Sequence, residues 1–309
     1  MTAAAGAGPI LVIKLGALGD FIQALGPFAA IRRHHKGAPV TLLTTEPFAE
    51  FARASPYFDD VWTGGRPRTP GGWIALRARL RGAGFARTYD LQTSDRSSFY
   101  FRLLWPGPYP EWSGIAGGCS HPHANPRRDF MHTIERQAEQ LAMAGIDDVP
   151  APDMSWVKSD AARFALPVPF AVVAPGGAAH RPQKRWPQSK FAALMTLLLE
   201  KNVTPVLIGG PEERALLRAL ATEVPAAVDV GEQTSLLDLV ALARRAGFAV
   251  GNDTGPMHAM AVAGCPTVVL YSSDSDPALC AQRGPKVTIL REAHLADLKV
   301  ERVAESLGL

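Results

Sequence analysis

The chain has 309 residues, a net charge of +3, 47% hydrophobic residues and 20% charged residues. This length suggests one large or two medium domains with a sizeable core, and so small a net charge gives no argument for a nucleic-acid partner. The three cysteines are far apart and form no CxxC pair, which argues against a disulfide framework or a zinc site and fits a reducing, cytoplasmic compartment. Residues 1–20 lack the pattern of a signal peptide, and no apolar run reaches the roughly 18 residues of a membrane span.

Along the first half of the chain, short β-branched segments alternate with longer amphipathic ones. We expect strands at residues 10–15, 39–45, 59–64 and 88–93, and helices at 20–35, 46–55 and 71–85. This alternation is typical of βαβ units, which build a parallel sheet covered by helices. The pattern breaks at 105–130, where glycine, proline and aromatic residues indicate a long loop, before a helix at 131–146.

An acidic, proline-rich segment at 147–156 predicts a linker, so we place domains at residues 1–155 and 156–309. A second series follows, with strands at 170–175, 204–210, 226–231, 248–253 and 266–272, and helices at 189–202, 212–224, 235–246, 255–264 and 294–309. The last helix could also pack back on the N-terminal domain. Such sheets bind ligands beyond the carboxyl ends of their strands, so a cleft between the two domains is the expected site.

The segment KLGALGD, residues 14–20, joins the first strand to the first helix. It is neither a GxGxxG fingerprint nor a P-loop, and a carboxylate at that helix start would repel a diphosphate. The free amides and the helix dipole would keep Asp20 ionised, so Asp20 is a usable general base. An alternative, slightly favoured by this segment alone, is that Asp20 only caps the helix.

The segment VGNDTGPMHAMAVAG, residues 250–264, predicts an anion site at a helix start. Thr254 is suited to the N-cap, Gly255 lets a ligand approach the backbone, and the first amides of the helix face phosphate oxygens. Asp253 is awkward beside a phosphate and could instead cap the turn or accept from a ribose hydroxyl. His258, taken alone, is more typical of a packed helix histidine.

Two further strand ends carry polar residues. In APGGAAHRPQKRWPQSKF, residues 174–191, Lys184 beside glycine-rich backbone fits an anionic diphosphate, although an ordinary connection explains the segment equally well. In LIGGPEERA, residues 207–215, Glu213 is expected in a first helical turn for dipole reasons alone.

Three other groups of residues could have a function. DLQTSDRSS, residues 90–98, puts Asp90, Gln92 and Arg96 at a strand end facing the same expected cleft. An arginine run over 77–87 is usually a solvated face, but it could meet anionic lipid headgroups. HPH at 121–123, with His132, invites a metal site, but no acid or thiol completes a ligand set at a familiar spacing.

The four strand-end motifs, in this order, resemble glycosyltransferase family 9, the bacterial heptosyltransferases, over nearly the whole chain. VIKLGALGDFIQALGP is similar to the family's Gly-Asp strand–helix turn, PGGAAHRPQKRWPQSKFAAL to its Lys-Arg-Trp-Pro loop, LIGGPEE to its Gly-Gly-Pro-x-Glu turn, and GNDTGPMHAMAVAG to its Asp-Thr-Gly-x-x-His helix start. The resemblance implies an α/β GT-B fold of two Rossmann-like domains. It also implies an inverting, metal-independent transfer of a sugar from a nucleotide donor, typically ADP-heptose, to a lipopolysaccharide core or related glycan acceptor.

Carried over by position, the resemblance makes Asp20 the general base. It makes the donor-binding residues Lys184, Glu213, Asp253, Thr254, Gly255 and His258, and the acceptor-binding candidates Lys14, Gln92 and Arg96. No cofactor, metal or nucleic acid is expected, and the implied location is the cytoplasm, with peripheral contact to inner-membrane headgroups as an option.

The sequence departs from the family's pattern at two places. Ala17 stands where members often carry serine, and YSSDSDPALC lacks the family's Gly-Pro-Thr/Ser turn, which bears on the acceptor and donor contacts respectively. Alternatives are a transferase with a different donor, another nucleotide-sugar enzyme such as an epimerase or hydrolase, and a non-catalytic sugar-nucleotide binding module. A Rossmann dehydrogenase is disfavoured, because no dinucleotide fingerprint follows the first strand.

Overall fold

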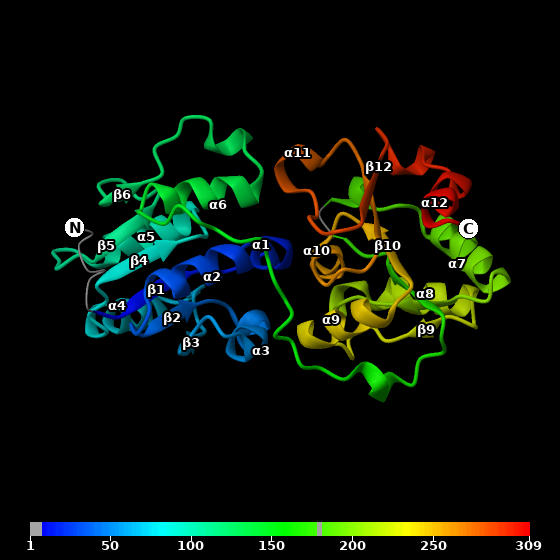
Figure 1. Ribbon diagram of the computed structural model, residues 1–309, viewed down its shortest axis with the longest axis horizontal. Coiled ribbons are helices and arrows are strands. Elements are labelled where there is room, and N and C mark those ends of the chain that lie inside the picture. Colours follow the sequence, from blue (N-terminus) through cyan, green and yellow to red (C-terminus); the bar gives the residue numbers. More distant parts are fainter. Residues whose placement is uncertain (1–7, 178–180) are drawn as a thin grey trace. The chain divides into compact units, whose positions relative to one another are not determined.

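The computed structural model describes residues 8–177 and 181–309, and the chain divides into two compact units, Met1–Trp156 and Val157–Leu309 (Figure 1). Residues 1–7, read above as lacking a signal peptide, and residues 178–180 of the APGGAAH segment lie outside the described residues. Each unit is built on a six-stranded sheet whose neighbouring strands are all parallel. This confirms the α/β class expected from the alternating pattern.

The first unit has the strand order β3-β2-β1-β4-β5-β6. Its strands are β1 (Ile10–Ile13), β2 (Val40–Leu43), β3 (Asp60–Trp62), β4 (Arg87–Asp90), β5 (Glu111–Gly114) and β6 (His121–Pro122). Its helices are α1 (Leu18–Gln23), α2 (Leu25–His34), α3 (Glu46–Ala54), α4 (Pro70–Gly82), α5 (Asp95–Leu103) and α6 (Thr133–Ala142), with a short 3-10 helix, η1 (Arg128–Phe130).

Two expectations for this unit need correction. The helix expected at 20–35 begins earlier, at Leu18, and is divided at Ala24 into α1 and α2. The expected loop at 105–130 contains two strands, β5 and β6, and the 3-10 helix η1. The prolines and glycines around β5 and β6 interrupt the apolar pattern from which strands are predicted.

The second unit has the strand order β12-β11-β10-β7-β8-β9. Its strands are β7 (Phe170–Ala174), β8 (Thr204–Leu207), β9 (Val228–Asp229), β10 (Phe248–Asn252), β11 (Thr267–Tyr271) and β12 (Val287–Arg291). Its helices are α7 (Gln188–Glu200), α8 (Arg214–Glu223), α9 (Leu236–Arg245), α10 (Gly255–Val262), α11 (Pro277–Cys280) and α12 (Val300–Leu307), with 3-10 helices η2 (Ala161–Phe164), η3 (Pro182–Lys184), η4 (Pro211–Glu213) and η5 (Leu295–Asp297).

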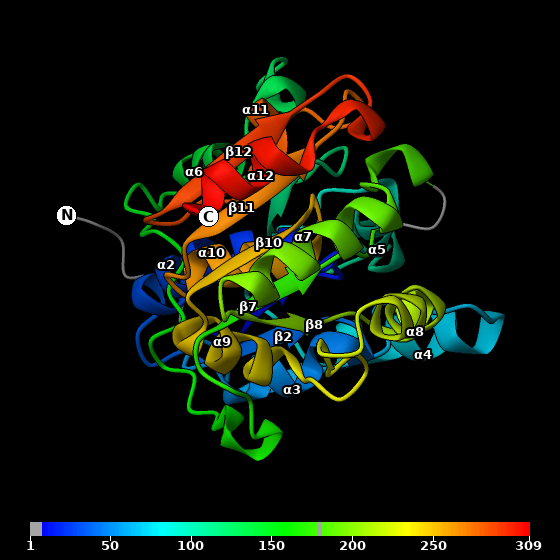
Figure 2. The ribbon, with the colours of Figure 1, turned by 90° about the vertical axis from the view of Figure 1, so that its right-hand side faces the viewer.

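Strand β7 shows how this unit is packed. Its side chains alternate between the two faces of the sheet, so Ala171 and Val173 join one core and Val172 joins the other. Figures 1 and 2 show α12, α7 and α8 in a row, and their buried apolar residues all belong to the first of these cores. Burial on both faces is what makes parallel strands continuously apolar.

Two features at the end of the chain differ from the sequence pattern. The edge strand β12 is absent from the expected series, and the helix expected at 294–309 is divided into η5 and α12. The sequence left open whether this helix returns to the first domain. Its buried residues Val303 and Ala304 belong to the core of the second unit.

In each unit the chain first builds one half of its sheet and then the other. The strand order therefore reverses between β1 and β4 in the first unit, and between β7 and β10 in the second. Ligands of open parallel sheets bind at such switch points, beyond the carboxyl ends of the strands. The motifs singled out from the sequence follow these four strands and β8. In the part of the chain that is described, no helix is both long enough and apolar enough to cross a bilayer.

Candidate active site

The turn that carries Asp20 follows β1 at the switch point of the first unit. Gly16 has a φ of +113°, and a Cβ added there would lie 2.8 Å from Cε2 of Phe48, so this turn requires glycine. The N-cap of α1 is Ala17, which has no side-chain cap, and the helix begins at Leu18. Asp20 is therefore the third residue of the helix.

This position rules out the alternative that Asp20 caps the helix. The carboxylate lies in the first turn, where the helix dipole favours an anion. No hydrogen bond or ion pair joins it to another residue within 8–177 and 181–309, and the residue is partly exposed. The helix thus places Asp20 without a hydrogen bond or an ion pair to the described part of the chain.

Lys14 and Gln92 tie this turn to the end of β4. The Lys14 ammonium, only 3% exposed, donates to the carbonyl of Leu91 at 3.0 Å. Burial lowers the pKa of Lys14, while the charges of Asp20 and Asp90 act to raise it. The amide of Leu15 donates to Oε1 of Gln92 at 2.8 Å. Both residues were expected to bind the acceptor; the structure gives them a role in holding the turn.

Asp90 lies beneath the turn and is fully buried. Its Oδ1 accepts hydrogen bonds from the amides of Gln92 and Thr93, each at 3.1 Å, while its Oδ2 has no partner among the described residues. Burial raises the pKa of this carboxyl to about 6. Arg96, the remaining acceptor candidate, is exposed on the first turn of α5, with its guanidinium 5.8 Å from the ring centroid of Trp73.

In the second unit, Asp253 accepts hydrogen bonds from three polar side chains at the end of β10. Its Oδ2 accepts from Nζ of Lys184 at 2.5 Å and from the hydroxyl of Ser275 at 2.7 Å, and its Oδ1 accepts from Nε2 of Gln282 at 3.1 Å. Burial acts to raise the pKa of Asp253, but these donors together hold it below the usual value. The acid that looked awkward beside a phosphate is therefore the partner that positions Lys184.

Thr254 and Gly255 form the start of α10, beside this carboxylate. Thr254 occupies the N-cap position, but its hydroxyl makes no cap, and its buried Oγ1 has no partner in the described part of the chain. The helix begins at Gly255, whose amide is one of those that a helix leaves unused at its N-terminus. His258 lies one turn further on and is 6% exposed. A hydroxyl and an amide at a helix start suit an anionic oxygen.

The ends of β7 and β8 complete this group. A Cβ on Gly176 would lie 2.5 Å from Cγ of Glu213, so the glycine allows this close packing, and a Cβ on Gly177 would lie 3.8 Å from Cγ2 of Thr254. Oε2 of Glu213 accepts from the amide of Gly210 at 2.8 Å. Lys184, Glu213, Asp253, Thr254 and Gly255 thus gather at the carboxyl ends of adjacent strands.

Comparison with known proteins shows the family to which the chain belongs. The model of the family described as glycosyltransferase family 9 (heptosyltransferase) matches residues 73–307, which is more than half of the chain. The chain belongs to glycosyltransferase family 9. This confirms the family predicted from the strand-end motifs and makes the protein a glycosyltransferase.

Individual relatives differ in how much of this family 9 transferase they match. Lipooligosaccharide heptosyltransferase 2 of Haemophilus influenzae is 28% identical over 120 residues, which is 37% of this chain and 34% of that protein. The match thus spans about a third of the length of that relative. The structure of the ADP-heptose LPS heptosyltransferase II of E. coli is similar with a TM-score of 0.82 and 21% identity, over 97% of each chain. E. coli heptosyltransferase WaaC, solved with ADP, is similar with a TM-score of 0.76 and 21% identity, over 97% of this chain and 99% of that one. These likenesses confirm the GT-B fold.

Sequence reasoning missed three side chains that organise the site of this family 9 transferase. Asn252 is fully buried; its Oδ1 accepts from the amide of Trp186 at 2.9 Å, and its Nδ2 donates to the carbonyls of Pro175 and Gly176. Ser275 and Gln282 hold Asp253. Asn252 is a polar residue at the end of an apolar strand, and this pattern could have indicated it from the sequence. Ser275 comes from the segment YSSDSDPALC, which departs from the family's pattern, so no motif indicated it.

The histidines that suggested a metal site are distributed among carboxylates. Nε2 of His123 lies 2.8 Å from Oε2 of Glu139, and Nδ1 of His132 lies 3.0 Å from Oε2 of Glu135. Within the described ranges, no three histidine, cysteine or acidic side chains come together as ligands for one ion.

Proposed function

We propose that this glycosyltransferase moves a sugar, heptose from ADP-heptose, onto a lipopolysaccharide core or related glycan acceptor, with inversion and without a metal. Asp20 is the general base, and the second unit binds the donor. The observation that carries the proposal is the Asp20 carboxylate, which lies in the first turn of α1 and makes no hydrogen bond or ion pair with a described residue. The location in this proposal is the cytoplasm, at the inner face of the cytoplasmic membrane.

The donor side of the proposal rests on the charges around α10. Lys184 is paired with Asp253, the residue directly before the N-cap of this helix, and the Thr254 hydroxyl and the Gly255 amide provide neutral donors at the helix start. A leaving diphosphate gains negative charge as the glycosidic bond breaks, and preorganised donors and a cation stabilise that charge. The family relative WaaC, whose structure was solved with ADP, supports an adenine nucleotide as the donor's leaving group. Glu213 and His258 are proposed as further contacts to the donor.

The acceptor side supplies the nucleophile. The acceptor hydroxyl lies at Asp20, loses its proton to that carboxylate and attacks the anomeric carbon, while the nucleotide diphosphate departs from the opposite face of the sugar. This single displacement inverts the anomeric configuration. It also requires that water be excluded from the donor, since water would otherwise hydrolyse it. Arg96 is the proposed acceptor cation, because it is exposed beside the switch point.

Replacement of Asp20 tests the base. Asp20→Asn keeps the shape of the side chain and removes the proton acceptor, so we expect kcat to fall by roughly 10²- to 10⁴-fold. The affinity for ADP, measured by calorimetry, stays within about twofold. Asp95→Asn is the matched control, because Asp95 is also a first-turn carboxylate of the first unit and is exposed.

Four outcomes would contradict the proposal or part of it. Normal turnover by Asp20→Asn would remove the base assignment. Breakdown of ADP-heptose at full rate without an acceptor would indicate a hydrolase or epimerase. Tight nucleotide-sugar binding without turnover over a panel of glycan acceptors would indicate a binding module, and preference for a UDP-, GDP- or CDP-sugar would change the donor.

A further inference from the structure

The two oxygens of the Asp253 carboxylate have different partners. Oδ2 accepts from Nζ of Lys184 and from the hydroxyl of Ser275, whereas Oδ1 accepts from Nε2 of Gln282. The Lys184 ammonium has three N–H groups, and the hydrogen bond to Asp253 uses one of them. In the described part of the chain Lys184 makes no other hydrogen bond, so two N–H groups remain for a ligand.

Tyr271 fixes the direction in which the Gln282 amide points. Gln282 is only 2% exposed, its Oε1 accepts from the hydroxyl of Tyr271 at 2.9 Å, and its Nε2 donates to Asp253 at 3.1 Å. An ionised carboxylate only accepts, so the amide turns its NH₂ group to Asp253 and its oxygen to Tyr271. Tyr271 is fully buried at the end of β11, whose Leu270 carbonyl accepts from the amide of Asp253. The tyrosine, the amide and the carboxylate therefore form one chain of hydrogen bonds with a single direction.

The neutral donors limit how far Asp253 draws on Lys184. A buried acceptor that loses its donor is costly, so without Gln282 the free Oδ1 would take a second hydrogen bond from the lysine ammonium. A lysine bound through both carboxylate oxygens has fewer N–H groups left for another anion. Gln282 and Ser275 thus keep Lys184 able to bind a second anion while it remains paired with Asp253.

We propose that Tyr271 and Gln282 are positioning residues for donor binding, which hold Asp253 so that Lys184 presents two N–H groups to the donor diphosphate. This inference rests on the proposed function, because it takes the diphosphate of a nucleotide sugar as the ligand of Lys184. Tyr271 acts through Gln282, and Gln282 acts through Asp253. Tyr271 begins the segment YSSDSDPALC, and Gln282 follows shortly after it, so the segment that departs from the family's pattern supplies groups that hold Asp253.

Gln282→Glu tests this role through a dependence on pH. When protonated, the introduced carboxyl donates to Asp253 and accepts from Tyr271, as the amide does; when ionised, it cannot donate and it repels Asp253. Burial and the neighbouring charge of Asp253 raise the pKa of the introduced carboxyl above that of an ordinary glutamate. We expect its affinity for ADP, measured by calorimetry, to be within about threefold of the parent chain at about pH 5.5 and about tenfold weaker at about pH 8.

Three other titratable groups of this cluster keep their charge over that range. Burial raises the pKa of Tyr271 and of the Cys280 thiol. Burial acts to raise the pKa of Asp253, but its hydrogen-bond donors hold it below the usual value. Lys184 and His258, in the first turn of α10, are present in the parent as well, so each affinity is compared with that of the parent at the same pH.

Tyr271→Phe removes only the hydroxyl that orients the amide. We expect the affinity for ADP to fall about fivefold. In a Lys184→Met background the same substitution should change the affinity by less than about twofold, because the tyrosine acts through the lysine.

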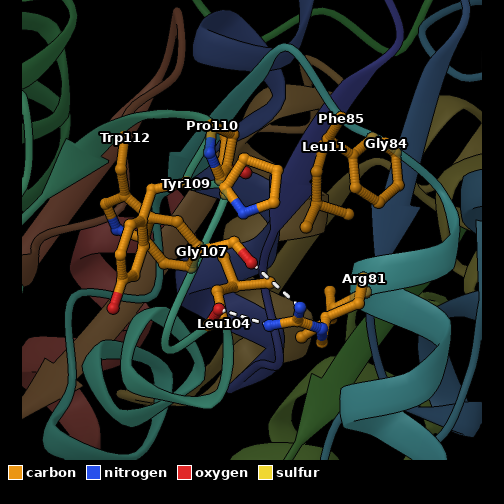
Figure 3. A pocket seen from close by; sticks show the side chains of 12 residues that line it. Leu11, Arg81, Gly84, Phe85, Leu104, Gly107, Tyr109, Pro110 and Trp112 are labelled. Carbon is orange, nitrogen blue, oxygen red and sulfur yellow. Dashed lines mark hydrogen bonds between the residues drawn. The ribbon is translucent and has the colours of Figure 1, made fainter.

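Two variants of the first unit control for a general loss of stability, because the proposed donor-binding groups all belong to the second unit. Gln140→Glu introduces a carboxyl at another buried glutamine, which is 1% exposed. Arg81→Met removes hydrogen bonds to the carbonyls of Leu104 and Gly107 (Figure 3). Both should lower stability and leave the affinity for ADP within about twofold of the parent at either pH.

Two results would overturn the positioning role alone. These are an affinity of Gln282→Glu that follows the parent at both pH values, and equal losses in Tyr271→Phe and the control variants. In both cases the parent still binds ADP, so the proposed function stands. If the parent prefers UDP, GDP or CDP, the same measurements are made with that diphosphate. A parent that binds none of the four would overturn the proposed function and the positioning role together.

Discussion

Each unit places an aspartate where a switch-point strand meets a helix, and the two aspartates are treated in opposite ways. Asp20 sits inside the first turn of α1 and has no partner among the described residues, whereas Asp253 precedes α10 and is held by Lys184, Ser275 and Gln282. An unpartnered carboxylate is available to accept a proton, and a saturated one is available only to position its partners. The same residue type at similar places in two similar sheets thus suits two different tasks.

The largest effect is expected from replacing Lys184, the cation that holds Asp253. Lys184→Met leaves the buried Asp253 carboxylate without its cation, so we expect the free energy of unfolding to fall by about 3 kcal/mol and nucleotide affinity to fall as well. Adding Asp253→Asn removes the uncompensated charge and should restore most of the stability but none of the affinity. Urea denaturation and calorimetry with ADP distinguish the two effects. Full recovery of ADP binding in the double variant would show that Lys184 does not contact the donor.

The dependence of folding stability on pH distinguishes the two units further, because Asp90, the buried acid beneath the Asp20 turn, and Asp253 act on it in opposite senses. Its folded-state pKa of about 6 lies above the usual 3.8, so the folded chain retains a proton that the unfolded chain has lost between about pH 4 and 6. Stability from this group is therefore present at low pH and falls as pH rises through 6, by up to about 3 kcal/mol. Asp253, whose pKa is lowered, acts in the opposite sense and loses its contribution as the pH falls below about 4.

Asp90→Asn isolates this contribution. The amide keeps an oxygen for the Gln92 and Thr93 amides and removes the titrating proton, so unfolding measured from pH 4 to 7 should depend less steeply on pH than in the parent chain. Parallel pH profiles for the two proteins would mean that Asp90 does not titrate in this window.

Gln92→Leu tests whether the turn that carries Asp20 depends on the hydrogen bond between the Leu15 amide and Gln92. The Leu15 amide loses its acceptor, so we expect a loss of about 1–2 kcal/mol in stability and a kcat reduced about tenfold with ADP affinity unchanged. Gln92→Glu restores an acceptor oxygen and should recover most of kcat. A variant that changes only the KM for the acceptor would instead support the direct contact predicted from the sequence.

The smallest structural effect is expected at Thr254. Thr254→Val removes a buried hydroxyl without a described partner, so stability should change by less than about 0.5 kcal/mol. Affinity for ADP should fall about tenfold if that hydroxyl contacts the diphosphate. Unchanged affinity would leave the Gly255 amide and Lys184 as the donor contacts at this helix start.

The alternating pattern predicted most of the strands and helices, because parallel strands are buried on both faces and read as continuous apolar runs. It missed the strands β5, β6 and β12 and the helices α5 and α11. The strands β5 and β6 lie among prolines and glycines, and β12 is a half-exposed edge strand. The motifs also predicted which residues follow the switch-point strands. The role of Asp20 as a cap was wrong, since the local sequence does not show that the helix begins at Leu18.

The sequence by itself determined the βαβ series, the family and the placement of Asp20, Lys184, Asp253 and Thr254 at strand ends. In a parallel sheet every strand end of this kind falls on one edge, so these placements follow from local periodicity. Only the tertiary structure decided which of these side chains are paired and which are left over. Lys184 and Asp253 are 69 residues apart, and Lys14 meets the carbonyl of Leu91 at a separation of 77. Burial and hydrogen-bond partners come from such distant residues, and they set whether a carboxylate holds a lysine or remains available as a base.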